Sequence, residues 1–135
     1  MSNNKTKHLE FIQATISRMN TNSFLLKGWS TTILIALVVF SLKESDADYM
    51  AIVYTPTLIF WFLDGYFLSQ ERRYRELFES VRIKDEDTID FSMKTKEFEQ
   101  RKNHWISSTF SITLILFYGV LIILSCLSIL FIKNI

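Results

Sequence analysis

Three long apolar runs, with the charged residues gathered between them, constrain this chain more than any other feature. The runs cover residues 24–42, 49–68 and 105–132. A helix of about 17–25 residues crosses the roughly 30 Å hydrocarbon core of a bilayer, where a central charge costs about 2.5–3.5 kcal/mol. Charges kept out of such runs are typical of a membrane protein. The sequence therefore predicts an all-α integral membrane protein with three transmembrane helices.

The basic residues predict the orientation of the chain. Thirteen of the 15 Lys and Arg residues lie before or at the start of the first run, or between the second and third runs. They are Lys5, Lys7, Arg18, Lys27, Arg72, Arg73, Arg75, Arg82, Lys84, Lys94, Lys96, Arg101 and Lys102. Because basic residues gather on the cytoplasmic side, the amino terminus and the long loop are expected in the cytoplasm and the carboxyl terminus outside. In a bacterium this places the chain in the inner membrane.

The predicted segments are a cytoplasmic amphipathic helix (1–22), a transmembrane hairpin (23–69), a cytoplasmic helical segment (70–104), a third transmembrane helix (105–132) and an external tail (133–135). The amphipathic helix is predicted from the helical spacing of Leu9, Ile12, Ile16 and Met19. It is expected to end near residues 20–23, where Asn22 or Ser23 can cap the next helix. A six-residue acidic turn at 43–48 closes the hairpin.

The segment 70–104 is expected to contain two helices. Tyr74, Leu77, Phe78 and Val81 follow the spacing of an amphipathic helix, which can continue the second span into the cytoplasm. Residues 94–105 are expected to form a second short helix that leads into the third span. The acidic residues 85–87 lack the glycine and the spacing of a calcium loop, and are predicted to be a solvated turn.

Asp64 is the sharpest single feature, because a carboxylate within a membrane span is a functional candidate by default. It lies a few residues from the cytoplasmic end of the second span, and Lys27 lies at a similar depth in the antiparallel first span. The favoured interpretation is a structural ion pair between Lys27 and Asp64. A proton- or ion-binding role and simple extension toward the interface are the alternatives.

The third span carries a polar stripe. Ser111, Tyr118 and Ser125 repeat every seven residues, His104 continues the line, and Ser108 lies beside it. Small and polar residues at such spacing pack membrane helices together. The stripe either packs against the hairpin of the same chain or forms the seam or pore lining of a homo-oligomer, and the sequence leaves both open. A single three-helix protomer has little room for an aqueous path, so a channel would be oligomeric.

A basic and aromatic cluster follows the second span: Arg72, Arg73, Tyr74 and Arg75. Its position favours contact with anionic lipid headgroups. Basic residues interleaved with an aromatic ring also suit a nucleotide or single-stranded nucleic acid, through phosphate pairing and base stacking. Nearby glutamates weaken the positive field, so lipid contact is the favoured role.

The sequence predicts no catalytic residues, no metal site and no cofactor. Phosphate-binding, nucleophile-elbow and zinc motifs are missing from it, and both histidines are isolated. The single cysteine, Cys126, lies in the last apolar run and has no cysteine to pair with in this chain.

The strings NSFLLKGW at 22–29 and DGYFLSQERR at 64–73 resemble those of small bacterial membrane proteins. The three-helix plan is similar to that of the channel-like effector of the Hailong antiphage system, with the resemblance covering about residues 11–83. It implies a homo-oligomeric, tetrameric channel that is controlled by a nucleic-acid-like signal from a partner nucleotidyltransferase. Opening of such a channel would depolarise an infected cell. The resemblance assigns no role to any single residue.

Three functions are therefore considered from the sequence. The favoured one is an oligomeric, ligand-gated membrane effector of antiphage defence. The second is a non-conducting membrane anchor or accessory subunit that recruits a cytosolic partner through residues 70–104. The third is a holin-like lysis protein, although the strongly basic tail of such proteins is lacking here.

Overall fold

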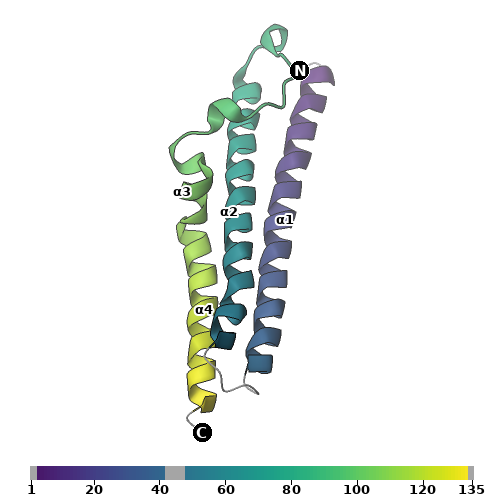
Figure 1. Ribbon diagram of the computed structural model, residues 1–135. Helices are drawn as coiled ribbons and strands as arrows, with labels where there is room; N and C mark the ends of the chain where they lie inside the picture. Colours follow the sequence, from purple (N-terminus) through teal and green to yellow (C-terminus); the bar gives the residue numbers. More distant parts are fainter. Residues whose placement is uncertain (1–2, 42–47, 134–135) are drawn as a thin grey trace.

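The computed structural model describes residues 3–41 and 48–133, which are all-helical, with no β-strand among them. Three long helices make up most of the fold: α1 (Asn3–Ser41), α2 (Asp48–Ile83) and α4 (Ile112–Lys133). Between α2 and α4 lie η1 (Glu86–Thr88), η2 (Lys96–Phe98), η3 (Arg101–Asn103) and α3 (Trp105–Thr109). In Figure 1, α2 lies between α1 and α4, and the short 3-10 turns gather at the end where α1 begins.

Helix α1 is one continuous helix of 39 residues, so the predicted break near residues 20–23 is wrong. At about 1.5 Å per residue it is about 58 Å long. The reason is tertiary packing, since Ile16, Ser23 and Ser30 are buried at heptad spacing along α1 and continue one contact face across the expected break. Packing against a neighbouring helix outweighs the weak local preference of Asn and Ser for caps. Ser23 is therefore a contact residue and not a cap.

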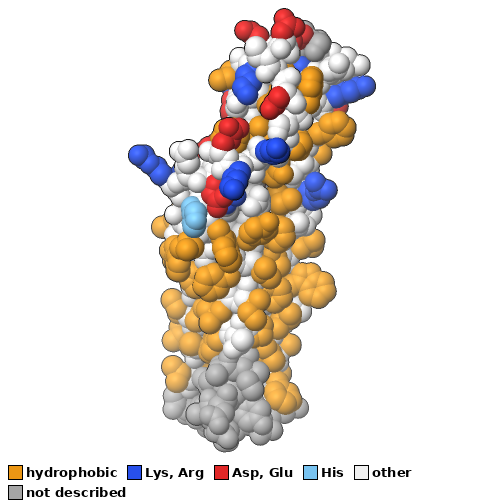
Figure 2. Space-filling model, turned by 45° about the horizontal axis from the view of Figure 1, so that its top comes forward, with side chains coloured by type: hydrophobic (Ala, Val, Ile, Leu, Met, Phe, Trp, Pro, Cys, Tyr) orange, Lys and Arg blue, Asp and Glu red, His pale blue; other side chains and the backbone are white. Residues whose placement is uncertain are grey.

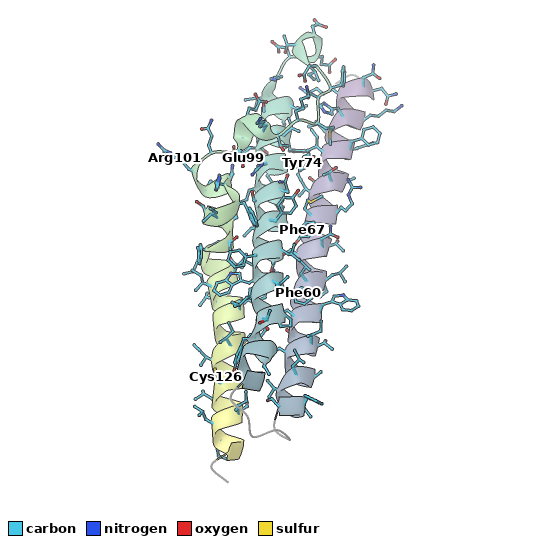
Figure 3. The ribbon with its side chains drawn as sticks, in the orientation of Figure 1. Phe60, Phe67, Tyr74, Glu99, Arg101 and Cys126 are labelled. Carbon is cyan, nitrogen blue, oxygen red and sulfur yellow. The ribbon has the colours of Figure 1, made fainter. Side chains whose placement is uncertain are left out.

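Helices α1 and α2 pack along their length in two clusters. A head cluster at the start of α1 contains Leu9, Ile12, Ile16, Leu77, Val81 and Ile89. A far cluster contains Leu34, Val38, Val53 and Ile129. Between them, Phe60 and Phe67 on α2 lie against α1, and Tyr74 continues their line into the head cluster (Figure 3). The acidic turn expected at 43–48 lies almost wholly outside the described residues.

The expected single helix over 105–132 is wrong, because the chain breaks at Phe110 and Ser111 between α3 and α4. The carbonyl of Thr109 accepts a hydrogen bond from Trp61 Nε1 of α2 at 2.9 Å. That carbonyl would otherwise accept the helical bond from residue 113. A side chain of a neighbouring helix therefore replaces a helical hydrogen bond at the break.

The second short helix expected at 94–105 is also wrong. Only two 3-10 turns, η2 and η3, form there, and Arg101 has a positive φ of 44° that interrupts a right-handed helix. In contrast, α2 does continue beyond its apolar part as far as Ile83, and the acidic residues 85–87 are exposed beside and within η1.

Two of the helices are long and apolar enough to cross a membrane by length and composition, α1 over Asn3–Ser41 and α4 over Ile112–Phe131. The third span, expected at 49–68 on α2, stays a prediction. Only 22% of the apolar window of α4 is buried inside the protein. Figure 2 shows hydrophobic side chains covering the middle of the visible face, with the Lys, Arg, Asp and Glu side chains gathered beyond them at one end.

Candidate functional site

A cluster of four polar side chains lies inside the bundle, where α1, α2 and α4 meet. Its centre is Asp64 of α2, which is fully buried at 0% exposure. Lys27 of α1 places its Nζ 2.6 Å from Asp64 Oδ2, so the ion pair expected from the sequence forms. Ser23, one helical turn before Lys27, donates its hydroxyl to Asp64 Oδ1 and accepts a hydrogen bond from Lys27 at 2.8 Å. We call Ser23, Lys27, Asp64 and Tyr118 the Asp64 cluster.

Helix α4 joins this cluster through Tyr118, which is fully buried. Its hydroxyl donates to Asp64 Oδ2 at 3.1 Å. The ring of Tyr118 stacks on Trp61 with centroids 5.7 Å apart and planes 7° apart. Phe117, the preceding residue, presents its ring to Lys27 Nζ at 5.8 Å from the centroid. The carboxylate thus accepts hydrogen bonds from α1 and α4, and α4 also partly covers the Lys27 cation with the Phe117 ring.

Away from this cluster α4 packs less closely on α1. A groove of about 290 Å³ runs between the two helices and is lined by Leu34, Ile35, Val38, Val39, Leu121, Leu124, Ser125 and Ser128. On α1, one helical turn before Leu34, Ser30 Oγ is buried with no hydrogen-bond partner among the described residues. The Tyr118–Asp64 bond is a polar contact that holds α4 to α2 beside this less closely packed groove.

The polar stripe expected on the third span does not form an open seam in this protomer. Ser108, Tyr118 and Ser125 are buried against other helices of the same chain. Ser125 donates to Tyr54 on α2 at 3.4 Å as well as to its own helix. Ser111 is half-buried at the helix break, and its hydroxyl has no partner among the described residues. His104 is exposed and caps α3 by accepting from Ile106 N.

The basic cluster expected to contact lipid or a ligand is mostly occupied within the chain. Arg73 is buried and pairs with Glu99 at 2.8 Å, and Arg75 pairs with Glu71 at 2.7 Å. Arg72 donates to the carbonyl of Lys102 at 2.7 Å. Tyr74 packs against the head cluster. Arg72 and Arg73 thus hold the segment before α3 against α2, and the expected lipid or ligand contact of this cluster stays a prediction.

The residue that they surround is Asn103, which is 2% exposed. Its carbonyl accepts from Ser69 at 2.6 Å and from Arg73 at 3.3 Å, and its side-chain amide donates to Glu76. We call Ser69, Arg73, Glu76 and Asn103 the Asn103 cluster. It fixes η3 and the start of α3 to α2, and it begins five residues beyond Asp64 on that helix.

The sequence did not single out Ser23, Trp61 or Asn103 as site residues. Ser23 could have been identified, since it lies four residues before Lys27 and so shares its helix face.

Among the described residues no group of three or more His, Cys, Asp or Glu side chains could hold a metal ion. Comparisons with protein-family models, curated proteins and solved structures find no match for this chain. The fold and the cluster define an all-helical chain with two helices able to span a membrane.

Proposed function

We propose that this chain is an oligomeric, channel-like effector of the bacterial inner membrane, with three spans, a cytoplasmic amino terminus and a closed state that depends on the Asp64 cluster. A nucleotide or oligonucleotide signal, made by a partner nucleotidyltransferase, controls its opening during phage infection, as the resemblance to the Hailong effector implies. Opening dissipates the membrane potential. The single observation that carries the proposal is the ion pair between Lys27 and the fully buried Asp64, which also accepts a hydrogen bond from Tyr118.

The distribution of exposed apolar side chains supports insertion in the membrane. A water-soluble bundle buries its most apolar helix, but most of the apolar window of α4 is exposed. Large apolar side chains are exposed on all three long helices, within the apolar runs that the sequence predicts to be spans. They are Phe24, Leu25, Trp29, Ile35, Val39, Phe40, Leu58, Ile59, Phe62, Leu63, Ile112, Ile115, Leu116, Val120, Ile123, Leu124, Leu127, Leu130 and Phe131. Lipid chains cover such a surface without cost, and α2 contributes to it as a third span.

The energetics of a buried charge pair support a role in gating. Replacing a buried ion pair with well-packed apolar side chains often keeps or raises the stability of a protein. Removing one partner of the pair instead costs about 3–5 kcal/mol. A pair of this kind therefore gives a helix interface two distinct states, paired and separated. Because Tyr118 is the α4 member of the cluster, breaking its bond to Asp64 frees α4 from α2.

The buried polar stripe has a place in the same proposal. Ser108, Tyr118 and Ser125 are covered by α2 in the described arrangement, so we assign this arrangement to the closed state. Separation of α4 from α2 would turn these side chains toward the α4 helices of other copies. A polar lining then forms between protomers, because a single protomer is too narrow for an aqueous path.

A second function is favoured by the same burial. When the polar stripe is buried within one protomer, the outer surface of the protomer consists of apolar side chains. Such a surface suits a non-conducting membrane anchor. In that case residues 70–104 recruit a cytosolic partner. The anchor predicts no ion flux from any variant of the Asp64 cluster.

Ion flux from liposomes separates the two functions. Purified protein is reconstituted into potassium-loaded liposomes, and efflux is followed for the wild type, Asp64→Asn and Tyr66→Phe. Tyr66 is a half-exposed residue near Asp64 with no hydroxyl bond to the described residues, and serves as the matched control. We expect Asp64→Asn to raise efflux above that of the wild type and the control. Equal efflux from all three, at the background of empty liposomes, would contradict the channel.

A further inference from the structure

A pocket of about 410 Å³ lies at the far end of the head cluster, beside the first turns of α1. It is lined by Asn4, Lys7, His8, Phe11, Phe91 and Met93. Phe11 lies twelve residues before Ser23, so it is about 18 Å from the Asp64 cluster along α1. The apolar walls of this pocket therefore lie outside the first span predicted from the sequence, residues 24–42, on its predicted cytoplasmic side.

The aromatic residues of the pocket are unusually open for this position. Phe11 is 66% exposed and Phe91 is 50% exposed. Phe91 also has a positive φ of 53°, a left-handed conformation that is unfavourable for a non-glycine residue. Its ring lies 5.5 Å from the ring of His8, tilted by 53°. Two open rings beside a buried imidazole offer flat surfaces for a planar ligand.

Two polar groups of the pocket, on His8 and Lys7, have no hydrogen-bond partner in the described part of the chain. His8 is 4% exposed, and its Nε2 contacts the carbonyl of Ser92 at 3.2 Å, but its Nδ1 has no hydrogen-bond partner among the described residues. Buried polar atoms are nearly always hydrogen-bonded. This nitrogen is therefore expected to form a hydrogen bond with a group outside the described residues. The ammonium of Lys7 is exposed and makes no bond to the described part of the chain. The pocket thus combines apolar rings, one unsatisfied imidazole nitrogen and one free cation.

We propose that this pocket binds a planar aromatic anion, such as a nucleoside monophosphate, with the ring against Phe91 and Phe11 and the anionic group at Lys7. His8 Nδ1 forms its missing hydrogen bond with a polar edge of the ligand ring. The role of this pocket as the site for the controlling ligand rests on the proposed function. Ligand binding to the pocket is measured separately from ion conduction. The pocket replaces the Arg72–Arg75 region as the candidate ligand site.

The test is an isothermal titration calorimetry experiment in which the full-length protein in nanodiscs is titrated with each of three probes. The probes are adenosine monophosphate, adenosine without the anion, and ribose 5-phosphate without the ring. We expect the monophosphate to bind more tightly than either other probe, and more weakly as sodium chloride is raised. No heat from the monophosphate at millimolar concentration, or equal affinity for adenosine and the monophosphate, would overturn the proposal.

Substitutions then locate the binding. Phe91→Ala is expected to weaken the monophosphate at least about fivefold, the loss of one stacking surface, and Lys7→Gln to remove the salt dependence. Ile83→Ala and Lys96→Gln, which change exposed residues outside the pocket, are expected to leave the affinity unchanged. If Phe91→Ala fails to fold, Phe11→Ala replaces it, because this ring projects from the continuous helix α1. Binding that none of the pocket substitutions weakens would place it elsewhere and contradict the proposal. Binding without any ion flux would instead contradict only the channel.

Discussion

Gly65 of α2 lies directly against Thr109 at the end of α3, with no room for a side chain between them. A Cβ atom on Gly65 would lie 2.1 Å from Thr109 Oγ1 and 2.7 Å from Thr109 Cα. Gly65 follows Asp64, and Thr109 stands just before the helix break. This approach therefore determines how closely the α3–α4 arm can pack beside the Asp64 cluster.

The first prediction concerns this approach. Gly65→Ala is expected to push α3 and α4 away from α2 and to lower the free energy of unfolding by about 1–3 kcal/mol. Gly119→Ala is the matched control, because a Cβ atom at Gly119 meets nothing within 4 Å, and there alanine is expected to be neutral or stabilising by up to about 1 kcal/mol. Denaturant unfolding in detergent measures both. Equal stability of the two variants would show that α2 and α3 do not approach as closely as described.

The second prediction concerns the ion pair. Asp64→Asn and Lys27→Gln alone are each expected to destabilise the protein, by up to about 3–5 kcal/mol. Each substitution leaves the other residue, 22% exposed for Lys27 and 0% for Asp64, without its counter-charge. The double variant is expected to be more stable than the sum of the single losses predicts. The interaction energy is obtained from unfolding of all four proteins. Strict additivity would mean that the two charges do not interact.

The third prediction concerns the hydroxyl of Tyr118. Tyr118→Phe retains the stacking on Trp61 but removes the bond to Asp64, at an expected cost of about 1.5–3 kcal/mol for a hydrogen bond to a charged group. Trp61 fluorescence is expected to change as α4 loosens. Tyr66→Phe, whose ring makes only edge contacts with Phe67 and Trp105, is the control and is expected to be silent. A Tyr118→Phe protein as stable as the control would remove α4 from the proposed closed-state contact.

The fourth prediction concerns Asn103. Asn103→Ala removes the bonds from the side-chain amide to Glu76 and to the carbonyl of Phe98. We expect faster amide hydrogen exchange over η2, η3 and α3, because these turns depend on α2 for their position. Gln100→Ala changes an exposed amide in the same segment, which bonds only to the carbonyl of Glu97, and is expected to leave the exchange unchanged. Similar exchange in both variants would assign the order of this segment to other contacts.

The sequence predicted the helical class and the Lys27–Asp64 pair because each follows from the length and depth of the apolar runs. Apolar runs of sufficient length indicate helices, and two opposite charges at equal depth on antiparallel helices meet. The break before α4 and the continuity of α1 depend instead on contacts between distant residues. Trp61 donates a hydrogen bond to the carbonyl of Thr109. The buried face of α1 formed by Ile16, Ser23 and Ser30 continues through the position where a helix cap was expected. No local pattern contains that information.

The polar stripe shows the same limit. Heptad spacing indicates that Tyr118 and Ser125 share a face, but it does not say which helix covers that face. The structure buries this face against the same chain. Likewise, the spacing of Arg72, Arg73 and Arg75 could not reveal that carbonyl groups and glutamates of the same chain occupy them.

If the Asp64 cluster holds the closed state of a membrane channel, its disruption opens the channel, and the membrane potential of living cells reports this opening. Bacteria expressing the wild type, Asp64→Asn or Tyr66→Phe are stained with a voltage-sensitive dye, at equal amounts of protein in the membrane. We expect Asp64→Asn to depolarise the cells, while the wild type and Tyr66→Phe leave the potential intact without phage. An unchanged potential in cells with Asp64→Asn, and in wild-type cells during phage infection, would contradict it.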